Sequence, residues 1–234
     1  MTAAPDLADW RDPPPPPRAP IDGRWARLEP LDPAAHAPAL HAANSASDAM
    51  WRWLPYGPFP DGAAYREWAA WAAAQDDPLF FTVIDRADGL PKGVATFMRI
   101  TPAHGVIELG HIAFSPSLQR TRVGTEALAS IMRRAFGLGY RRFEWKCDAG
   151  NAPSRRLAQR LGLSFEGVFR SHMIVKGRNR DTAWFAATDA DFPAIDAALT
   201  RWLDPANFDA AGRQRESLSD LTRPLRLASD AFAP

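Results

Sequence analysis

The alternation of apolar and polar residues predicts a chain built from about seven strands. The expected strands are 25–31, 80–85, 93–100, 106–114, 140–147, 164–169 and 182–188. The second and third form a hairpin around Asp88-Gly89, a turn-forming dipeptide. The last two also form a hairpin, and the loop between them is expected to carry the segment 177–181.

Helical periodicity predicts five helices between these strands. The expected helices run from Asp32 to about Asn44, from Asp61 through Ala72, from the loop after 106–114 to about Phe136, from Asn151 to Leu161, and over 190–203. The resulting order is strand, two helices, three strands, helix, strand, helix and two strands. Adjacent strands favour antiparallel hairpins, and the central strand–helix–strand favours one parallel crossover. The fold class is therefore α/β, of the α+β type, with helices on a mixed sheet.

Composition divides the chain of 234 residues into three parts. Residues 1–20 are rich in Pro and Ala and include five consecutive prolines from Pro13, so a flexible polyproline-type arm is expected. This arm could also be a ligand for a recognition domain. Residues 21–204 form the folded domain, and the weaker pattern over 205–234 indicates an extension of unknown role.

Positive charge gathers in one part of the chain. The whole chain carries only +1, which argues against a dedicated nucleic-acid binder. Residues 117–160 hold ten Arg and Lys against three acidic residues, so this segment carries +7 and the remainder −6. A small polyanionic cofactor would favour such a distribution. Solvated helix faces are the alternative explanation for Arg133, Arg134, Arg141 and Arg142.

Cys147 is the only cysteine, so an intrachain disulfide is excluded. No apolar run reaches the roughly 18 residues of a membrane span, and the N-terminus lacks the layout of a signal peptide. We therefore expect a cytoplasmic protein, a monomer or homodimer, that binds neither nucleic acid nor membranes and needs no metal.

The segment 119–127 carries the strongest functional signal. It follows the apolar strand 106–114 and opens a helix whose apolar positions include Leu128 and Ile131. A strand, a short polar loop with one glycine and a helix start thus follow in immediate succession. The first amides of a helix lack intrahelical partners and lie at its positive end, so this arrangement suits a phosphate group.

With this loop the chain resembles the GNAT superfamily of N-acetyltransferases, over about residues 22–190. It is similar in particular to the RimJ/RimL-type branch that acetylates ribosomal-protein N-termini. The family loop has the form Gln/Arg-x-x-Gly-x-Gly/Ala and binds the pyrophosphate of acetyl-CoA. Here it reads Gln119-Arg-Thr-Arg-Val-Gly124, with Arg122 at the first glycine position. A side chain restricts positive φ, so the backbone at Arg122 is a point to examine.

A second block at family spacing runs from Asn151 through Ser154, Leu157 and Leu161-Gly162 to Gly167. The resemblance implies that Asn151 contacts the pantetheine arm and that Ser154 lies near the thiol, where it could protonate the leaving thiolate. Helix capping by both residues is the structural alternative, and it is compatible with catalysis.

Glu108 is the best-placed candidate for the general base. Amine acetylation needs a neutral amine, and a carboxylate can take the proton directly or through one water. His111 is the second candidate because its ordinary pKa lies near neutrality. Strand alternation places the two side chains on opposite faces unless a bulge intervenes, and the resemblance to GNAT proteins implies such a bulge here. A structural role is the alternative for each.

The resemblance also implies a splayed central parallel pair, 106–114 and 140–147, along which acetyl-CoA binds before the amine attacks directly. Backbone N–H groups of Ile112 to Phe114 would hold the pantetheine and polarise the thioester carbonyl. Covalent catalysis by Cys147 is the competing mechanism, but no histidine partner is evident. The expected cofactor-binding residues are Ile112, Ala113, Phe114, Gln119, Arg120, Thr121, Arg122, Val123, Gly124, Thr125, Asn151 and Ser154.

The aromatic, proline-punctuated loop 51–59 lies between the first two helices, where GNAT proteins build the acceptor side. Trp51, Trp53 and Tyr56 could line a substrate pocket or contact an ammonium through cation–π interactions. A core plug at the sheet edge is the alternative. We therefore expect an acetyl-CoA-dependent N-acetyltransferase that acts on a small amine or a protein N-terminus. The alternative is an inactive acyl-CoA-binding module with the same fold, whereas a nucleotide-binding domain lacks its motifs.

Overall fold

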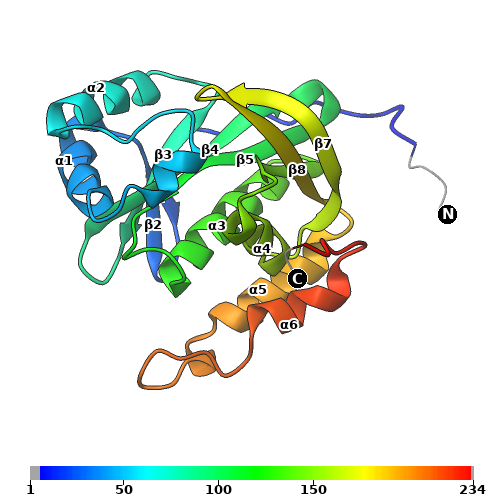
Figure 1. The fold of residues 1–234 in the computed structure, drawn as a ribbon. Helices are drawn as coiled ribbons and strands as arrows, with labels where there is room; N and C mark the ends of the chain where they lie inside the picture. Colours follow the sequence, from blue (N-terminus) through cyan, green and yellow to red (C-terminus); the bar gives the residue numbers. More distant parts are fainter. Residues whose placement is uncertain (1–5, 233–234) are drawn as a thin grey trace.

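The computed structural model describes residues 6–232, in which a mixed sheet lies between two layers of helices (Figure 1). Its eight strands are β1 (Ile21–Asp22), β2 (Ala26–Pro30), β3 (Leu79–Asp85), β4 (Leu90–Thr101), β5 (Val106–Phe114), β6 (Arg142–Asp148), β7 (Ser164–Val175) and β8 (Arg178–Thr188). They lie in the order β1-β2-β3-β4-β5-β6-β8-β7. Only β5 and β6 pair in parallel, and all other neighbours are antiparallel. The expected α/β mixed-sheet fold is confirmed.

The helices are α1 (Pro33–Asn44), α2 (Gly62–Ala73), α3 (Arg122–Gly137), α4 (Ala152–Arg160), α5 (Phe192–Leu203) and α6 (Leu218–Thr222). Short 3-10 turns cover Ala49–Trp53, Pro102–His104, Pro205–Asn207 and Arg223–Leu225. The Asp32 carboxylate accepts from the amides of Ala34 and Ala35, and Asp61 caps α2 in the same way. The N-caps predicted for both helices are confirmed, because a short acceptor side chain satisfies amides that the helix leaves unpaired. No helix in residues 6–232 is long and apolar enough to cross a membrane.

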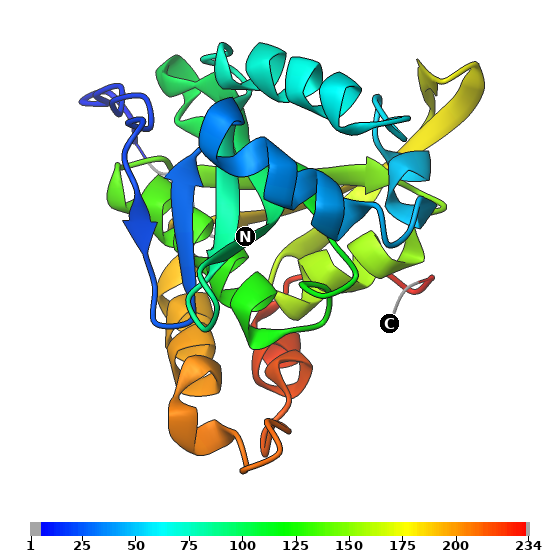
Figure 2. The same cartoon turned by 90° about the vertical axis from the view of Figure 1, so that its left-hand side faces the viewer.

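The two sheet faces bury different cores. Helices α1 and α2 pack on the β2–β4 part of one face, around Phe80 and Val94. Helices α3 and α5 pack on the opposite face, around Ile107 and Phe143. Figure 2 shows α1 and α2 above the sheet and α5 and α6 below it. The first face therefore continues past β4 without a helical cover, over β5, β6 and β8 (Figure 1).

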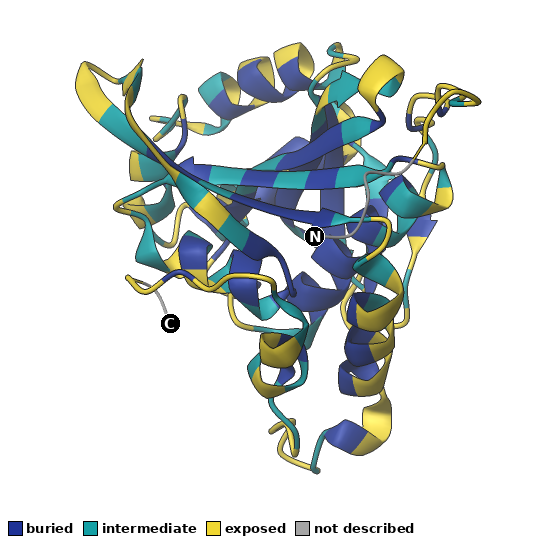
Figure 3. Ribbon diagram, turned by 90° about the vertical axis from the view of Figure 1, so that its right-hand side faces the viewer, coloured by how far each residue is buried: buried dark blue, intermediate teal, exposed yellow. Residues whose placement is uncertain are grey.

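Hairpin β7–β8 is longer than the sequence pattern predicts. The expectation of a loop over 177–181 is wrong, because β8 already begins at Arg178 and the turn is limited to Lys176 and Gly177. The pairing with β6 ends at Asp148–Thr182, so the outer hairpin has no third strand beside it. Without a buried face it needs no apolar alternation, which is the signal that prediction relies on. Its tip is mostly exposed (Figure 3).

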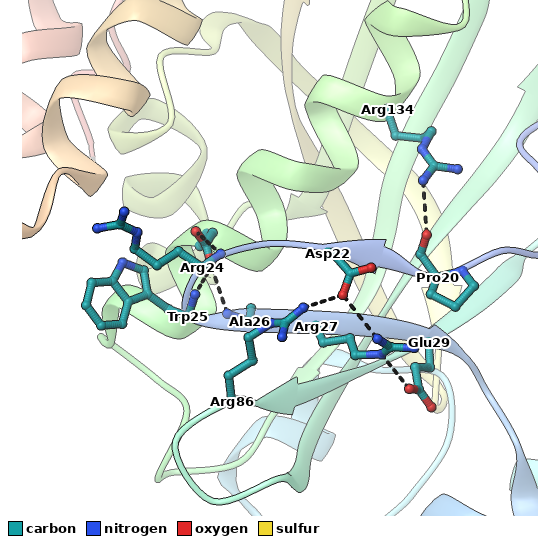
Figure 4. Close-up of polar contacts among 10 residues, drawn as sticks. Pro20, Asp22, Arg24, Trp25, Ala26, Arg27, Glu29, Arg86 and Arg134 are labelled. Carbon is teal, nitrogen blue, oxygen red and sulfur yellow. Dashed lines mark hydrogen bonds and ion pairs between the residues drawn. The ribbon is translucent and has the colours of Figure 1, made fainter.

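The described part of the N-terminal arm, 6–20, contains no helix or strand and leads into β1, the short strand that sequence analysis missed. Trp10 packs over Gly105, and Arg18 donates to the carbonyl of Ala73. Figure 4 shows the neighbouring contacts, in which Arg134 donates to the Pro20 carbonyl and Asp22 pairs with Arg27 and Arg86. The flexibility expected of the arm stays a prediction, and residues 1–5 lie outside the described residues.

The C-terminal extension packs against α4. The Arg155 guanidinium donates to both carboxylate oxygens of Asp230, at 2.5 and 2.6 Å, and both side chains are buried. Arg155 also donates to the carbonyl of Ala149 at 2.6 Å, in the loop between β6 and α4. The hydroxyl of Thr222 donates to the carbonyl of Arg160 at 3.2 Å. The extension therefore fixes α4 at both of its ends.

Candidate active site

The central parallel strands separate in the middle of the sheet. β5 and β6 pair from Val106–Arg142 to Leu109–Trp145, and no further pair follows although β5 continues to Phe114 and β6 to Asp148. Past Leu109, the edge of β5 that faces β6 is thus free of a strand partner. The N-termini of α3 and α4 follow directly after β5 and β6. An opening between two strands, with a helix start beyond each, can accept an extended ligand whose polar end binds backbone amides.

The start of α3 presents free backbone donors. Thr121 is the N-cap, and its hydroxyl accepts from the Gly124 amide at 3.0 Å. The Thr125 amide donates to the Thr121 carbonyl. Within residues 6–232, the amides of Arg122 and Val123 have no hydrogen-bond partner. These two amides, rather than those of Gly124 and Thr125, are the ones left to bind an anion.

Arg122 does not strain the loop, although it replaces a family glycine. It is the first residue of α3, and the residue with positive φ is Arg120, at 60°. The Arg122 guanidinium lies 3.7 Å from the centre of the Trp25 ring and 5.5 Å from that of Phe208. Its charge is therefore held against two aromatic rings from distant parts of the chain.

Gly124 lies at a close approach between loop and helix. A Cβ atom there would lie 2.9 Å from the Leu118 carbonyl oxygen and 3.1 Å from the Phe114 ring. The Gln119 amide group donates to the Phe114 carbonyl at 2.8 Å, which ties the loop to the end of β5. The other predicted β5 residues, Ile112 and Ala113, are partly buried and buried respectively. Only a residue without a side chain fits this contact.

The start of α4 brings Asn151 and Ser154 together. The Asn151 side chain accepts from the Ser154 amide at 3.2 Å, so Asn151 does cap the helix. The Ser154 hydroxyl accepts from the Trp145 indole at 3.1 Å. Because that oxygen acts as an acceptor, the hydroxyl hydrogen can be donated elsewhere. The two residues that the resemblance assigned to the pantetheine and thiol thus lie beside the opening between β5 and β6.

Glu108 faces the uncovered part of the sheet and forms a buried ion pair. Its Oε2 lies 2.6 Å from Lys146 Nζ and 3.3 Å from Arg99 Nε. The side chains of Glu108 and Lys146 are each only 4% exposed. Burial raises the pKa of Glu108, and the opposite charge of Lys146 limits that rise. Burial likewise lowers the pKa of Lys146, against the effect of Glu108.

His111 lies at a β-bulge, as the family resemblance implied. Val94 pairs with Ala113 and Thr96 with Gly110, so β5 contains one extra residue, and His111 has φ of 47°. The bulge turns the ring toward Tyr56, which stacks on it at 5.5 Å and shares a hydrogen bond of 3.2 Å between its hydroxyl and Nδ1. Burial, with a smaller effect of Arg180, lowers the pKa of His111 to about 4. The imidazole is therefore neutral at pH 7.

The aromatic loop is held by the tip of the β7–β8 hairpin. Lys176 Nζ donates to the carbonyls of Trp51, Tyr56 and Gly57 at 2.8, 3.0 and 2.6 Å. Trp51 is buried in the core beneath α1 and α2, whereas Trp53 and Tyr56 are half-buried. An ideal Cβ at Gly150 would lie 3.8 Å from the Trp53 ring, so this tryptophan reaches the loop before α4. The loop consequently forms a wall beside the opening.

Sequence reasoning missed Lys146, the basic partner of Glu108, and Trp184, the aromatic residue beside Lys146. Lys146 and Trp184 face each other across β6 and β8, with Nζ 4.5 Å from the indole ring centre. The register of β6 with β5 brings Lys146 to Glu108, and the sequence pattern did not reveal that register. Among the described residues, no group of three or more His, Cys, Asp and Glu side chains could hold a metal ion.

The model of the acetyltransferase (GNAT) domain matches residues 26–164, more than half of the chain, and covers both helix starts. The chain belongs to the GNAT family and is an N-acetyltransferase by this membership. No curated protein matches the chain.

Solved structures agree with this assignment. A GCN5-related N-acetyltransferase from Brucella melitensis is 46% identical, with a TM-score of 0.91 over 93% of this chain and 100% of that one. A probable acetyltransferase of the GNAT family from Chromobacterium violaceum is 42% identical, with a TM-score of 0.77 over 83% and 98%. RimL, a ribosomal L7/L12 α-N-protein acetyltransferase, is 20% identical, with a TM-score of 0.62 over 72% and 93%, and shares the fold.

Proposed function

We propose that this protein transfers an acetyl group from acetyl-CoA directly to a primary amine. The observation that carries the proposal is the position of Glu108, one residue before the last pair of β5 and β6, on the sheet face that no helix covers. The proposed reactants then meet between the strands, with the amine reaching the opening from this face. The use of acetyl-CoA and a single reduced cysteine favour a cytoplasmic setting.

The residues present fit a coenzyme diphosphate. The free amides of Arg122 and Val123 provide donors at the positive end of α3, a 16-residue helix. Gly124 keeps the helix start close to β5, and Gln119 fixes the loop. When bound, acetyl-CoA would supply the activated acetyl group as a thioester. The backbone of Gly110 to Phe114 that faces the opening offers groups for the pantetheine arm.

Glu108 has the properties of a base for the incoming ammonium. Its carboxylate lies in a low-dielectric site, and burial raises its pKa toward the range in which general bases work at neutral pH. Removal of one proton gives the amine the lone pair that forms the new N–C bond as the C–S bond breaks. His111 is a poorer candidate, because its ring stacks on Tyr56 and its pKa is lowered to about 4, which makes the imidazole a weak base.

Ser154 is suited to protonate the departing thiolate. Its oxygen accepts from the Trp145 indole, so the indole would stabilise negative charge that develops on that oxygen. The proton that Ser154 gives up returns from solvent, and Glu108 releases the amine proton to solvent. Asn151 keeps Ser154 in place through the helix cap.

Covalent catalysis by Cys147 finds no support. Cys147 is 6% exposed and belongs to the core that α3 covers. Burial raises the pKa of its thiol to about 11, so the reactive thiolate is scarce at neutral pH. An acetyl-enzyme on this residue is therefore disfavoured relative to direct transfer.

The alternative of an inactive binding module rested on Arg122. Because Arg122 starts α3 with an ordinary helical backbone, its side chain does not obstruct the amides that would bind phosphate. A name of one structural relative, RimL, describes action on a protein N-terminus. We favour a small amine, because an aromatic loop that Lys176 fixes to the hairpin could enclose one.

Two measurements test the proposed function. Calorimetry with acetyl-CoA and with CoA should show binding to the folded protein. Release of free thiol from acetyl-CoA should then depend on an added amine, in a panel of amino acids, polyamines, aromatic amines and short peptides. A folded protein that takes up neither acetyl-CoA nor CoA would refute the proposal, and binding without thiol release with any amine would leave only the binding module.

A further inference from the structure

The uncovered face holds unpaired hydrogen-bond donors. Within residues 6–232, Nε of Arg180 and Nε1 of Trp184 are buried atoms with no hydrogen-bond partner. Nζ of Lys146 and Oε2 of Glu108 are engaged with each other in the ion pair. A ligand that satisfies Arg180 and Trp184 must bring acceptor atoms. Buried polar groups without partners are costly, so these two donors indicate the chemistry of the missing group.

Arg180 is the donor whose charge is least compensated. It lies on β8 opposite Met173, on the same side of the strand as Trp184 by alternation. Its side chain is half-buried and forms no ion pair with any described acidic residue. Its positive charge nevertheless contributes to the lowered pKa of His111 and opposes part of the rise that burial causes in the pKa of Cys147, and these two residues lie on the two strands that separate. The guanidinium is therefore within electrostatic reach of the opening.

The charges around Glu108 are predominantly positive. Lys146 and Arg99 both contact Glu108, so two cations accompany this carboxylate, and Arg180 adds positive charge that acts on His111. The neighbouring Glu144 also acts on Glu108 and Lys146, but its negative charge is paired with Arg142 at 2.8 Å. An amine that arrives as a simple cation would be repelled, whereas one that also carries an anion would be attracted.

We propose that the acceptor is a small amine that carries a carboxylate, and that Arg180 binds this carboxylate while Glu108 receives the amine. This inference rests on the proposed function and specifies its substrate class. A planar guanidinium binds a carboxylate through two parallel hydrogen bonds, which also orients the bound molecule. Lys146 and Trp184 supply further donors on the same face. Arg180 is thus a residue that determines specificity, and Glu108 remains the base.

The test compares amines with the same side chain that do or do not carry a carboxylate. Phenylalanine, phenylalaninamide and phenethylamine form one matched series, and tyrosine, tyrosinamide and tyramine form another. Lysine and cadaverine provide an aliphatic pair. We expect kcat/KM to be at least tenfold higher for the amino acids than for the amides and the decarboxylated amines. Thiol release from acetyl-CoA is the readout throughout.

The Arg180→Met variant tests the residue itself. It should lower kcat/KM at least tenfold for the amino acids and by less than twofold for the amides and amines. Arg178→Met is the matched control, because Arg178 is an exposed arginine on the same strand and carries the same charge. Arg178→Met should leave kcat/KM unchanged for every substrate. Thermal unfolding of both variants verifies that they fold.

Three results would overturn the inference. If the amides and the decarboxylated amines are acetylated as efficiently as the amino acids, the carboxylate requirement is refuted, while the acetyltransferase function stands. An equal loss for every substrate in Arg180→Met would give Arg180 a structural role only. Acetyl-CoA binding without acetylation of any amine in the panel would refute the proposed function and the inference together.

Discussion

The two sides of the candidate site are assembled in different ways. The coenzyme side, comprising residues 119–125 and 151–154, is built from contacts between near neighbours in sequence: Thr121 with Gly124, and Asn151 with Ser154, each three residues apart. The acceptor side depends on contacts between residues that lie far apart in sequence. It comprises the aromatic loop, Glu108, His111, Lys146 and the β7–β8 hairpin. Tyr56 and His111 are 55 residues apart, and Lys176 binds carbonyls 119 to 125 residues away.

This difference has a physical consequence. Local caps form together with their helices, so the backbone donors of the coenzyme side are set by α3 and α4 themselves, while the extension fixes the position of α4. The acceptor side exists only when α1, α2, the sheet and the hairpin have come together. Substitutions on one side should therefore alter one ligand and spare the other, which three variants can examine.

Glu108→Gln should have the largest effect, because glutamine cannot take a proton from the amine. We expect kcat to fall by about 10²- to 10⁴-fold, with the Kd for acetyl-CoA unchanged in calorimetry. Glu144→Gln is the control, since Glu144 pairs with Glu108 in register and faces the same side. Unchanged turnover in Glu108→Gln would remove Glu108 from the mechanism. Thermal unfolding separates this loss from misfolding, because Lys146 loses its partner.

The pH profile refines this prediction. Burial raises the folded-state pKa of Glu108 above its ordinary value of 4.5, and only the ionised form accepts a proton. The kcat/KM of the wild type should therefore fall as the pH decreases through that raised pKa, while any residual activity of Glu108→Gln should lack this limb. A limb at the ordinary carboxylate pKa would contradict the assignment.

Gly124→Val should have the second largest effect, confined to the coenzyme side. Its Cβ would lie 2.9 Å from the Leu118 carbonyl, so the loop must move away from its amide donors. We expect the Kd for acetyl-CoA to rise by about tenfold or more, with the KM for the amine nearly unchanged. Gly137→Ala, in the same helix, is the control because no atom lies within 4 Å of its added Cβ. A matching rise in both constants would show that the two sides are not separable.

Lys176→Met should have the smallest effect, confined to the acceptor side. It leaves three carbonyls of the aromatic loop without their shared donor, so the loop is less well fixed. We expect the KM for the amine to rise by about three- to tenfold, with the Kd for acetyl-CoA unchanged. Arg178→Met again serves as the control. A weaker affinity for acetyl-CoA in Lys176→Met would contradict the division.

The same division explains what the sequence could predict. Caps at Asp32, Asp61 and Asn151 were read correctly because a short side chain and its amide partners lie within one turn. The bulge at His111 followed from the family resemblance, since alternation alone places His111 on the wrong face.

Residues that meet through register or tertiary packing were missed. Lys146 becomes the partner of Glu108 only because β5 and β6 pair in one particular register, which no periodicity within either strand encodes. Lys176 and Asp230 are polar residues in segments without apolar alternation, so their contacts gave no sequence signal. Hairpin β7–β8 was underestimated for the same reason.

The ion pair between Arg155 and Asp230 has a consequence for proteolysis. Residues 210–215 are exposed and contain two arginines, Arg213 and Arg215, so trypsin can reach this stretch in the folded protein. A single cut there would divide the chain, yet the smaller fragment would remain attached through Asp230 and Thr222. Denaturing gels would then show two bands while size exclusion still showed one species.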